Sequence, residues 1–215
     1  MNTPQQEDFD EDNPIPKKKL RFEEAFKELK KRLLDEWIDL SSAEAFEELA
    51  NFYIEHHRYR DALRYANSLL EELPYSAEAW ARKGIILFNL RRFSESLDCY
   101  ERATELDPTD PFIFINKGVA LEALSQYEDA LESFDAAISL DDENEEAYIN
   151  KVRTLEQLER YEEAEKILLN RIDILPEHPE AWYELGFCYD LLEQYQDAII
   201  CYDKHLDISP YDHDA

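Results

Sequence analysis

Apolar, small and polar residues recur along this chain in the same order at intervals of 34 residues. Within each interval the apolar residues are spaced three and four apart, which places their side chains on one face of an α-helix. One position always carries a large aromatic ring, and the 3 glycines of the chain share another position. The aromatic position holds Phe46, Trp80, Phe114, Tyr148 and Trp182, and the glycine position holds Gly84, Gly118 and Gly186. A recurrence this regular predicts an array of repeated helical units.

The repeats follow one another without insertion, and the pattern predicts two helices in each. The first helix begins near an acidic residue or a proline, as in the segment from Pro179 to Ala181. A break falls about halfway, for example at Arg91 to Phe93. A late proline ends the second helix because proline cannot continue it, except in the third repeat, where Asp142 takes its place. The predicted repeats are 43–76, 77–110, 111–144, 145–178 and 179–212. Residues 213–215 match the start of a sixth repeat, which favours a fragment of a longer array.

The residues at the recurring positions resemble the signature of the tetratricopeptide repeat (TPR) family. In the last repeat these residues are Trp182, Leu185, Gly186, Tyr189, Ala198, Tyr202, His205 and Pro210. The resemblance covers 170 of the 215 residues. It implies an all-α fold, a right-handed α-solenoid of antiparallel helix pairs, in which small residues let two helices approach and large rings fill the gaps between pairs.

Two departures from the family pattern affect the expected packing. Val152 replaces the glycine in the fourth repeat, and Leu69, Arg171 and His205 stand where the family prefers a small residue. A buried arginine without a partner is costly, so we expect the Arg171 guanidinium to reach solvent or an acid.

The segment before the repeats has two parts of opposite charge. Residues 1–16 contain five acids, three prolines and no base, and this composition predicts a disordered acidic tail. Residues 17–42 form a predicted amphipathic basic helix that caps the first repeat; a membrane-surface helix and a helix swapped between two protomers are the alternatives. Its apolar face comprises Phe22, Phe26, Leu29, Leu33, Trp37 and Leu40, and its basic residues are Lys17, Lys18, Lys19, Arg21, Lys27, Lys30, Lys31 and Arg32.

Composition narrows the choice of partner. The net charge is −28, which makes nucleic acid and anionic membrane surfaces unfavourable partners. The chain contains no apolar run of membrane-spanning length and no signal-peptide pattern at its N-terminus, so we expect a cytoplasmic protein. Cys99, Cys188 and Cys201 show no metal-binding or redox spacing, and we expect reduced, packed thiols.

The sequence offers no convincing catalytic or metal-binding motif. Acidic residues are so abundant that no carboxylate pair stands out, and the glycines fall inside predicted helices instead of phosphate-binding loops. The acidic segment from Asp141 to Glu146 lacks the central glycine and distal glutamate of a calcium-binding loop. The five histidines form no metalloprotease or triad pattern. We therefore predict that the chain is not an enzyme and needs no cofactor or metal.

The family resemblance implies a ligand-binding groove lined by the first helix of each repeat. Mapped onto this chain, the candidate groove residues are Arg82, Ile85, Asn89, Phe112, Ile115, Asn116, Val119, Ile149, Asn150, Arg153, Tyr183 and Phe187. Asn116 and Asn150 are suited to hydrogen-bond a peptide backbone, and Arg82 and Arg153 to bind carboxylates. A clamp of the type found in chaperone-binding members is disfavoured, because Glu47 and Asn51 replace its paired Lys and Asn.

These observations predict a scaffold that binds a partner peptide or protein on the concave face. One alternative is a homo-oligomeric assembly module that associates through exposed array ends. Another is an accessory interaction domain of a larger enzyme or signalling protein. Ordinary solvated helix surface is the remaining interpretation of the candidate groove, and apolar side chains on a face that the scaffold need not bury argue against it.

Overall fold

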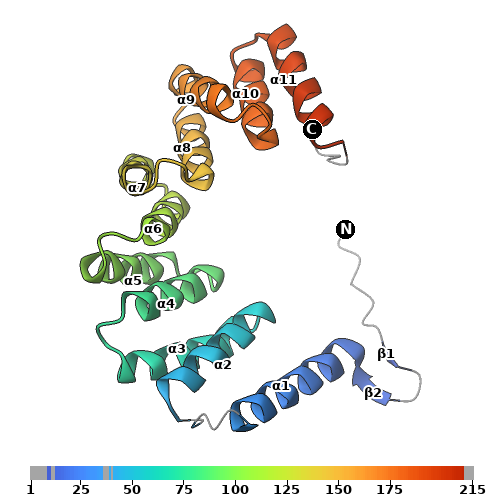
Figure 1. Ribbon diagram of the computed structural model, residues 1–215, viewed down its shortest axis with the longest axis vertical. Helices are drawn as coiled ribbons and strands as arrows, with labels where there is room; N and C mark the ends of the chain where they lie inside the picture. Colours follow the sequence, from blue (N-terminus) through green and yellow to red (C-terminus); the bar gives the residue numbers. More distant parts are fainter. Residues whose placement is uncertain (1–8, 11–12, 36–38, 40, 211–215) are drawn as a thin grey trace. The chain divides into compact units, whose positions relative to one another are not determined.

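The computed structural model describes residues 9–10, 13–35, 39 and 41–210. This part of the chain contains eleven α-helices, and within each unit the consecutive helices from α2 to α4 and from α5 to α11 pack on one another, which confirms the predicted all-α solenoid of repeated helix pairs (Figure 1). The chain divides into two compact units, residues 1–91 and 92–215. The boundary between the units falls inside the repeat 77–110, between its two helices.

The first unit contains a short strand pair and four helices. Strands β1 (Phe9–Asp10) and β2 (Asn13–Pro16) pair antiparallel and precede α1 (Lys17–Asp35), α2 (Ala43–Glu55), α3 (Tyr59–Glu72) and α4 (Ala77–Asn89). Six residues of the segment predicted to be disordered, 1–16, lie in these strands; Pro14 and Pro16 of β2 favour extended backbone, although neither can donate a ladder hydrogen bond. The other residues of that predicted tail, 1–8 and 11–12, lie outside the described residues.

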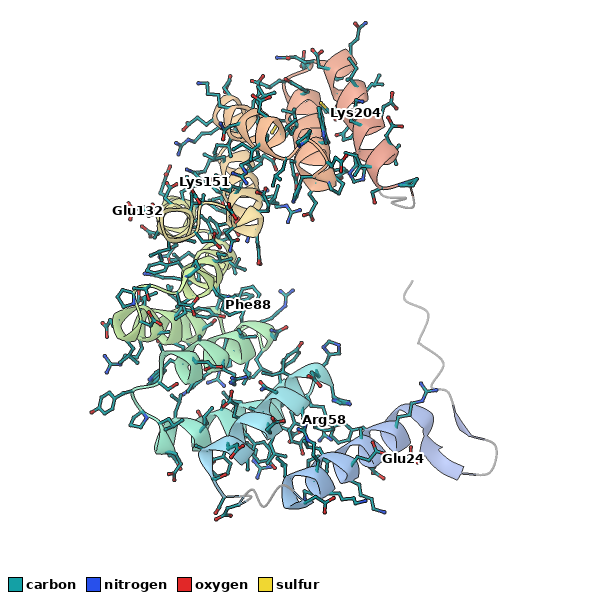
Figure 2. All side chains as sticks on the ribbon, in the orientation of Figure 1. Glu24, Arg58, Phe88, Glu132, Lys151 and Lys204 are labelled. Atoms are coloured by element: carbon teal, nitrogen blue, oxygen red, sulfur yellow. The ribbon has the colours of Figure 1, made fainter. Side chains whose placement is uncertain are left out.

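Helix α1 packs on α2 through the aromatic residues of the predicted apolar face. The ring centroid of Phe22 lies 5.2 Å from that of Phe52 and 5.8 Å from that of Tyr53. The Arg58 guanidinium, labelled in Figure 2, lies 4.5 Å from the Phe22 ring centroid and extends this cluster. Leu33 is fully buried. Trp37 and Leu40, predicted for the same face, lie outside the described residues.

The second unit continues the alternation of helices. It comprises α5 (Phe93–Leu106), α6 (Pro111–Ala123), α7 (Tyr127–Leu140), α8 (Glu145–Gln157), α9 (Tyr161–Ile174), α10 (Pro179–Leu191) and α11 (Tyr195–Ile208). Each helix packs on the next one, and α8 also contacts both α6 and α10, so that the first helices of three repeats are neighbours (Figure 1).

Helix ends repeat with the same period as the sequence. The residue before each first helix caps it by accepting a hydrogen bond from a backbone N–H of the first turn. Between the two helices of each repeat, one residue takes the left-handed conformation that ends a helix and redirects the chain. The caps are Ser42, Ser76, Asp110, Asn144 and His178, and the left-handed residues are His57, Arg91, Ser125, Glu159 and Glu193.

The buried Arg171 of α9 has the acidic partner predicted for it. Its guanidinium forms an ion pair with Glu145 of α8 and lies 4.3 Å from the ring centroid of Tyr148. The arginine therefore links two helices without leaving a buried charge unpaired.

Candidate functional site

Three neighbouring helices of the second unit present the candidate binding face. Phe112, Asn116 and Val119 follow one another at spacings of four and three on α6, so they share one side of that helix. Phe112 is 48% exposed, which is unusual for a phenylalanine, while Asn116 and Val119 are half-buried. We call the surface formed by these three residues, by Asn150 and Arg153 of α8 and by Tyr183 and Phe187 of α10 the A-helix face.

The residues that α8 and α10 contribute to this face differ in chemistry. Asn150 and Arg153 give α8 a polar surface, whereas Tyr183 and Phe187 give α10 an aromatic one, with Phe187 38% exposed. Because α8 packs between α6 and α10, the A-helix face has apolar groups at both ends and polar groups in the middle.

The two asparagines keep hydrogen-bonding capacity for a ligand. Asn116 donates one amide N–H to the backbone oxygen of Phe112 at 2.8 Å, which leaves its second N–H and its side-chain oxygen available. In the part of the chain that the structure describes, no hydrogen bond joins the Asn150 side chain to the protein. Both side chains are therefore able to bond a peptide backbone.

Two residues predicted to line the site, Ile115 and Ile149, are buried instead. They are only 3% and 4% exposed, and each belongs to a hydrophobic core cluster. Their position in the repeat turns them toward neighbouring helices, so they stabilise the array and offer no surface to a ligand.

Arg153 of α8 forms an ion pair with a residue of α10. Its Nε donates to Oε1 of Glu184 at 2.6 Å, and the Glu184 side chain is almost completely buried. The guanidinium remains half-exposed, but its charge is already balanced. A partner carboxylate would have to compete with Glu184 for it.

The half-buried Glu122 and the buried Glu156 form a polar seam between the first helices of neighbouring repeats. The hydroxyl of Thr154 donates to Glu122 at 2.8 Å, and one repeat later the thiol of Cys188 donates to Glu156 at 3.3 Å. Burial and the nearby Glu184 carboxylate raise the pKa of Glu156 to about 7, and burial also raises the pKa of Glu122. This seam was not predicted from the sequence, although the two glutamates are 34 residues apart and the hydrogen-bond donor to each lies 32 residues further along the chain.

In the first unit, Arg82 is committed to the protein's own acids. Its guanidinium pairs with Glu47 at 2.6 Å and Glu78 at 2.9 Å, and it also donates to Asn51. A partner carboxylate would therefore have to displace Glu47 or Glu78 from Arg82. Ile85 is half-buried on the same helix, and the exposed Asn89 donates to the backbone oxygen of Ile85 at 2.9 Å.

The described residues contain neither a metal-binding cluster nor a membrane-spanning helix. No group of three or more His, Cys, Asp or Glu side chains there is arranged to hold a metal ion. No described helix is both long and apolar enough to cross a membrane. All three cysteines are buried and free, in keeping with a packing role.

Sequence models described as tetratricopeptide repeat match the chain at residues 77–110 and 179–212, 121–172, and 99–132. Together these matches span residues 77–172 and 179–212, which is more than half of the 215 residues. No curated protein sequence matches the chain.

Solved structures with the same fold include MamA from Desulfovibrio magneticus RS-1, with a TM-score of 0.70, 19% identity, and coverage of 80% of this chain and 97% of that one. YrrB, described as a TPR protein with an unusual peptide-binding site, has a TM-score of 0.64, 24% identity, and coverage of 86% and 93%. The first TPR of Spaghetti (RPAP3) bound to the HSP90 peptide SRMEEVD has a TM-score of 0.53, 21% identity, and coverage of 56% and 95%. These identities establish the fold alone.

Proposed function

This chain belongs to the tetratricopeptide repeat family, and we propose that it is a protein-interaction scaffold that binds a partner peptide on the A-helix face of its second unit. The observation that carries the proposal is the exposure of Phe112 and Phe187 at the two ends of a face whose middle offers the Asn150 amide. Exposed large apolar side chains that lie close together are typical of interaction sites.

The spacing of the helices limits the kind of peptide. Adjacent packed helices lie about 8–10 Å apart, so a ligand reaching from α6 to α10 crosses roughly 20 Å. An extended chain covers that distance with about six residues. The proposal therefore specifies an extended segment with two large apolar side chains about six residues apart, bonded through its backbone to Asn116 and Asn150.

The relatives support a binding role only in outline. YrrB is described as having a peptide-binding site, and the RPAP3 domain as bound to a peptide. We propose the same general role for this chain. We do not propose the HSP90 peptide as a ligand, because Glu47 and Asn51 are both bonded to Arg82 and the negative charge of Glu47 would repel a carboxylate. The proposed role is binding and release without chemical conversion of the partner.

Replacing the two asparagines tests the proposal. A peptide is first selected for binding to the whole protein from a random-peptide phage library. We expect Asn116→Ala with Asn150→Ala to weaken its binding at least tenfold by isothermal titration calorimetry, because two backbone hydrogen bonds are lost. Thermal unfolding should change by only a few degrees, since both side chains lie at the surface.

Two asparagines on second helices provide the matched control. Asn67 and Asn170 are exposed on α3 and α9. Their replacement by alanine should leave the affinity unchanged. Equal affinities for the wild type and the Asn116/Asn150 variant would reject the proposed face.

Self-association is a second candidate function, favoured by one observation on α11. Ile199 is 59% exposed, whereas Leu131, which occupies the same repeat position on α7, is 6% exposed. Ile200 beside it is 56% exposed. If this face joins two copies, light scattering should show a mass that rises with concentration and falls to the monomer value in an Ile199→Ser, Ile200→Ser variant. A concentration-independent monomer would exclude this role.

A further inference from the structure

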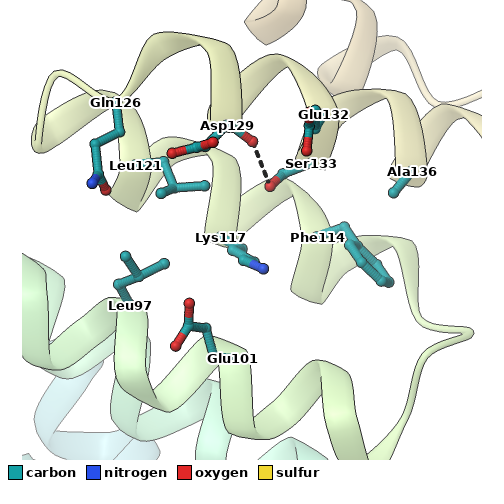
Figure 3. Close-up of a pocket in the computed structure, with 10 residues that line it drawn as sticks. All are labelled: Leu97, Glu101, Phe114, Lys117, Leu121, Gln126, Asp129, Glu132, Ser133 and Ala136. Atoms are coloured by element: carbon teal, nitrogen blue, oxygen red, sulfur yellow. Dashed lines mark hydrogen bonds between the residues drawn. The ribbon is translucent and has the colours of Figure 1, made fainter.

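A groove of about 460 Å³ opens between α5, α6 and α7 (Figure 3). Its α6 residues are Phe114, Lys117 and Leu121, which lie on the opposite side of that helix from Phe112, Asn116 and Val119. The groove is therefore separate from the A-helix face. We call it the α5–α7 groove.

The groove combines apolar walls with acidic groups. Leu97 of α5 and the apolar residues of α6 line its interior, while the carboxylates come from Glu101 of α5 and from Asp129 and Glu132 of α7 (Figure 3). Lys117 supplies the one positive charge among the lining residues. All three acidic residues are exposed, so a ligand can reach them.

The same groove recurs one repeat later, between α7, α8 and α9, with a volume of about 540 Å³. We call it the α7–α9 groove. Leu131, Asp135, Lys151 and Leu155 occupy the positions that Leu97, Glu101, Lys117 and Leu121 occupy in the first groove. The two grooves therefore allow a comparison within one protein.

In the α7–α9 groove three of the four acidic residues have cationic partners, and the fourth, Glu132, lines both grooves. Lys151 pairs with Asp135 at 2.5 Å. Arg160 pairs with Glu163 at 2.6 Å and with Glu128 at 3.2 Å. Lys166 adds a third positive charge to the lining.

In the α5–α7 groove two of the three corresponding cations, the counterparts of Arg160 and Lys166, are replaced by uncharged or acidic residues. Gln126 stands at the position of Arg160, and Glu132 stands at the position of Lys166. Among the described residues, the charged side chains of this groove form no ion pair with one another or with other groups. If Lys117 pairs with Glu101 as Lys151 pairs with Asp135, the carboxylates of Asp129 and Glu132 still lack a cation.

We propose that the α5–α7 groove binds an arginine or lysine side chain from a partner protein segment. The cationic head takes the place beside Asp129 that the Arg160 guanidinium has beside Glu163 in the other groove, and Glu132 provides a second carboxylate. The aliphatic stem packs on Leu97 and Leu121, as long cationic side chains do on apolar surface. A guanidinium suits two carboxylates better than an ammonium, because its planar donors can bond both.

The test uses the ¹⁵N-labelled whole protein and blocked pentapeptides observed by NMR. The probes are Gly-Leu-Arg-Leu-Gly, an analogue with neutral citrulline in place of arginine, and an analogue with glutamate there. We expect the arginine peptide to shift the amides of Glu101, Lys117, Asp129 and Glu132, and the citrulline analogue to bind at least fivefold more weakly. Shifts scattered over the protein, or equal affinity for the arginine and citrulline peptides, would overturn the proposal. Stronger binding of the glutamate peptide would instead assign the groove to anions through Lys117.

An exchange of side chains between the grooves sharpens the test. Gln126→Arg with Glu132→Lys gives the α5–α7 groove the cations of its neighbour and should weaken binding of the arginine peptide at least tenfold. Arg160→Gln with Lys166→Glu should create a second set of shifts around Lys151. Thermal unfolding of both variants checks that they remain folded. Unchanged affinity in the folded Gln126/Glu132 variant would contradict the proposal.

The Asn116→Ala, Asn150→Ala variant separates this site from the A-helix face. Its affinity for the arginine peptide should equal that of the wild type, because the asparagines lie on the other side of their helices. A matching loss of affinity would show that the peptide binds the A-helix face and would overturn the assignment to the groove.

Discussion

The ring of Phe134 on α7 lies so close to Gly118 on α6 that a Cβ at Gly118 would stand 2.5 Å from Cε1 of that ring. Phe134 is fully buried and cannot move aside freely. Gly118→Ala should therefore destabilise the protein, since overpacking a core costs about 1–3 kcal/mol, more than the ~1 kcal/mol that alanine gains over glycine in a helix. Urea unfolding measures the difference. A variant as stable as the wild type would contradict this account of the glycine.

A second variant identifies the cause of that loss. In the fourth repeat Val152 takes the glycine position, and the smaller Leu168 takes the ring position in the same core cluster. Phe134→Leu should therefore partly rescue Gly118→Ala, so that the double variant loses less stability than the sum of the two single losses. Additive losses would show that the ring is not the obstacle.

The buried pair of Arg171 and Glu145 should be far more sensitive than a surface pair. Glu145→Gln leaves the Arg171 charge buried without its partner, which costs about 3–5 kcal/mol. The control is Glu105→Gln, which breaks the exposed pair with Arg102 and should cost about 1 kcal/mol or less. Urea unfolding compares the two variants. Similar losses would mean that Arg171 finds another partner.

Glu156 should make stability depend on pH. Its pKa rises from 4.5 in the unfolded chain to about 7 in the fold, because burial and then Glu184 disfavour the charged form. A raised carboxyl pKa stabilises the fold below about pH 4.5, and this stabilisation is lost as the pH rises through about 7. Glu156→Gln removes the titration, so its stability relative to the wild type should rise by roughly 3 kcal/mol between pH 4.5 and pH 8.

Unfolding measurements at pH 4.5 and pH 8 on both proteins give that difference directly. The exposed Glu143 supplies a control for the change in net charge, because Glu143→Gln removes one surface carboxylate. A Glu156→Gln variant with the wild-type pH dependence would mean that Glu156 is ionised in the fold at little cost.

The repeat period made the fold predictable from sequence. Aromatic and small residues at fixed positions specify how closely the helices approach, and these positions recur in every repeat. The capping residues Ser76, Asp110 and Asn144 were missed, although a polar residue before each first helix is a recognisable signal. The left-handed residues Ser125 and Glu159 carry no such signal, since most non-glycine residues avoid that conformation.

The candidate site was only partly predictable, because repeat position specifies the side of a helix but not the final burial. Ile115 and Ile149 share a position with Tyr183, yet both isoleucines are buried while Tyr183 is half-buried. Ion pairs between repeats could not be predicted either, since partners such as Arg82 and Glu47 are 35 residues apart in sequence. Packing between neighbouring repeats decides both outcomes, and a pattern within one repeat does not contain that information.

The most direct test of the proposed function removes the two exposed aromatic side chains. Phe112→Ser with Phe187→Ser should weaken binding of the phage-selected peptide at least tenfold, measured by isothermal titration calorimetry. The control is Leu140→Ser with Leu169→Ser, two leucines that are each 42% exposed on second helices, and it should bind as tightly as the wild type. Equal affinity of the Phe112/Phe187 variant and the wild type would contradict the assignment of peptide binding to the A-helix face.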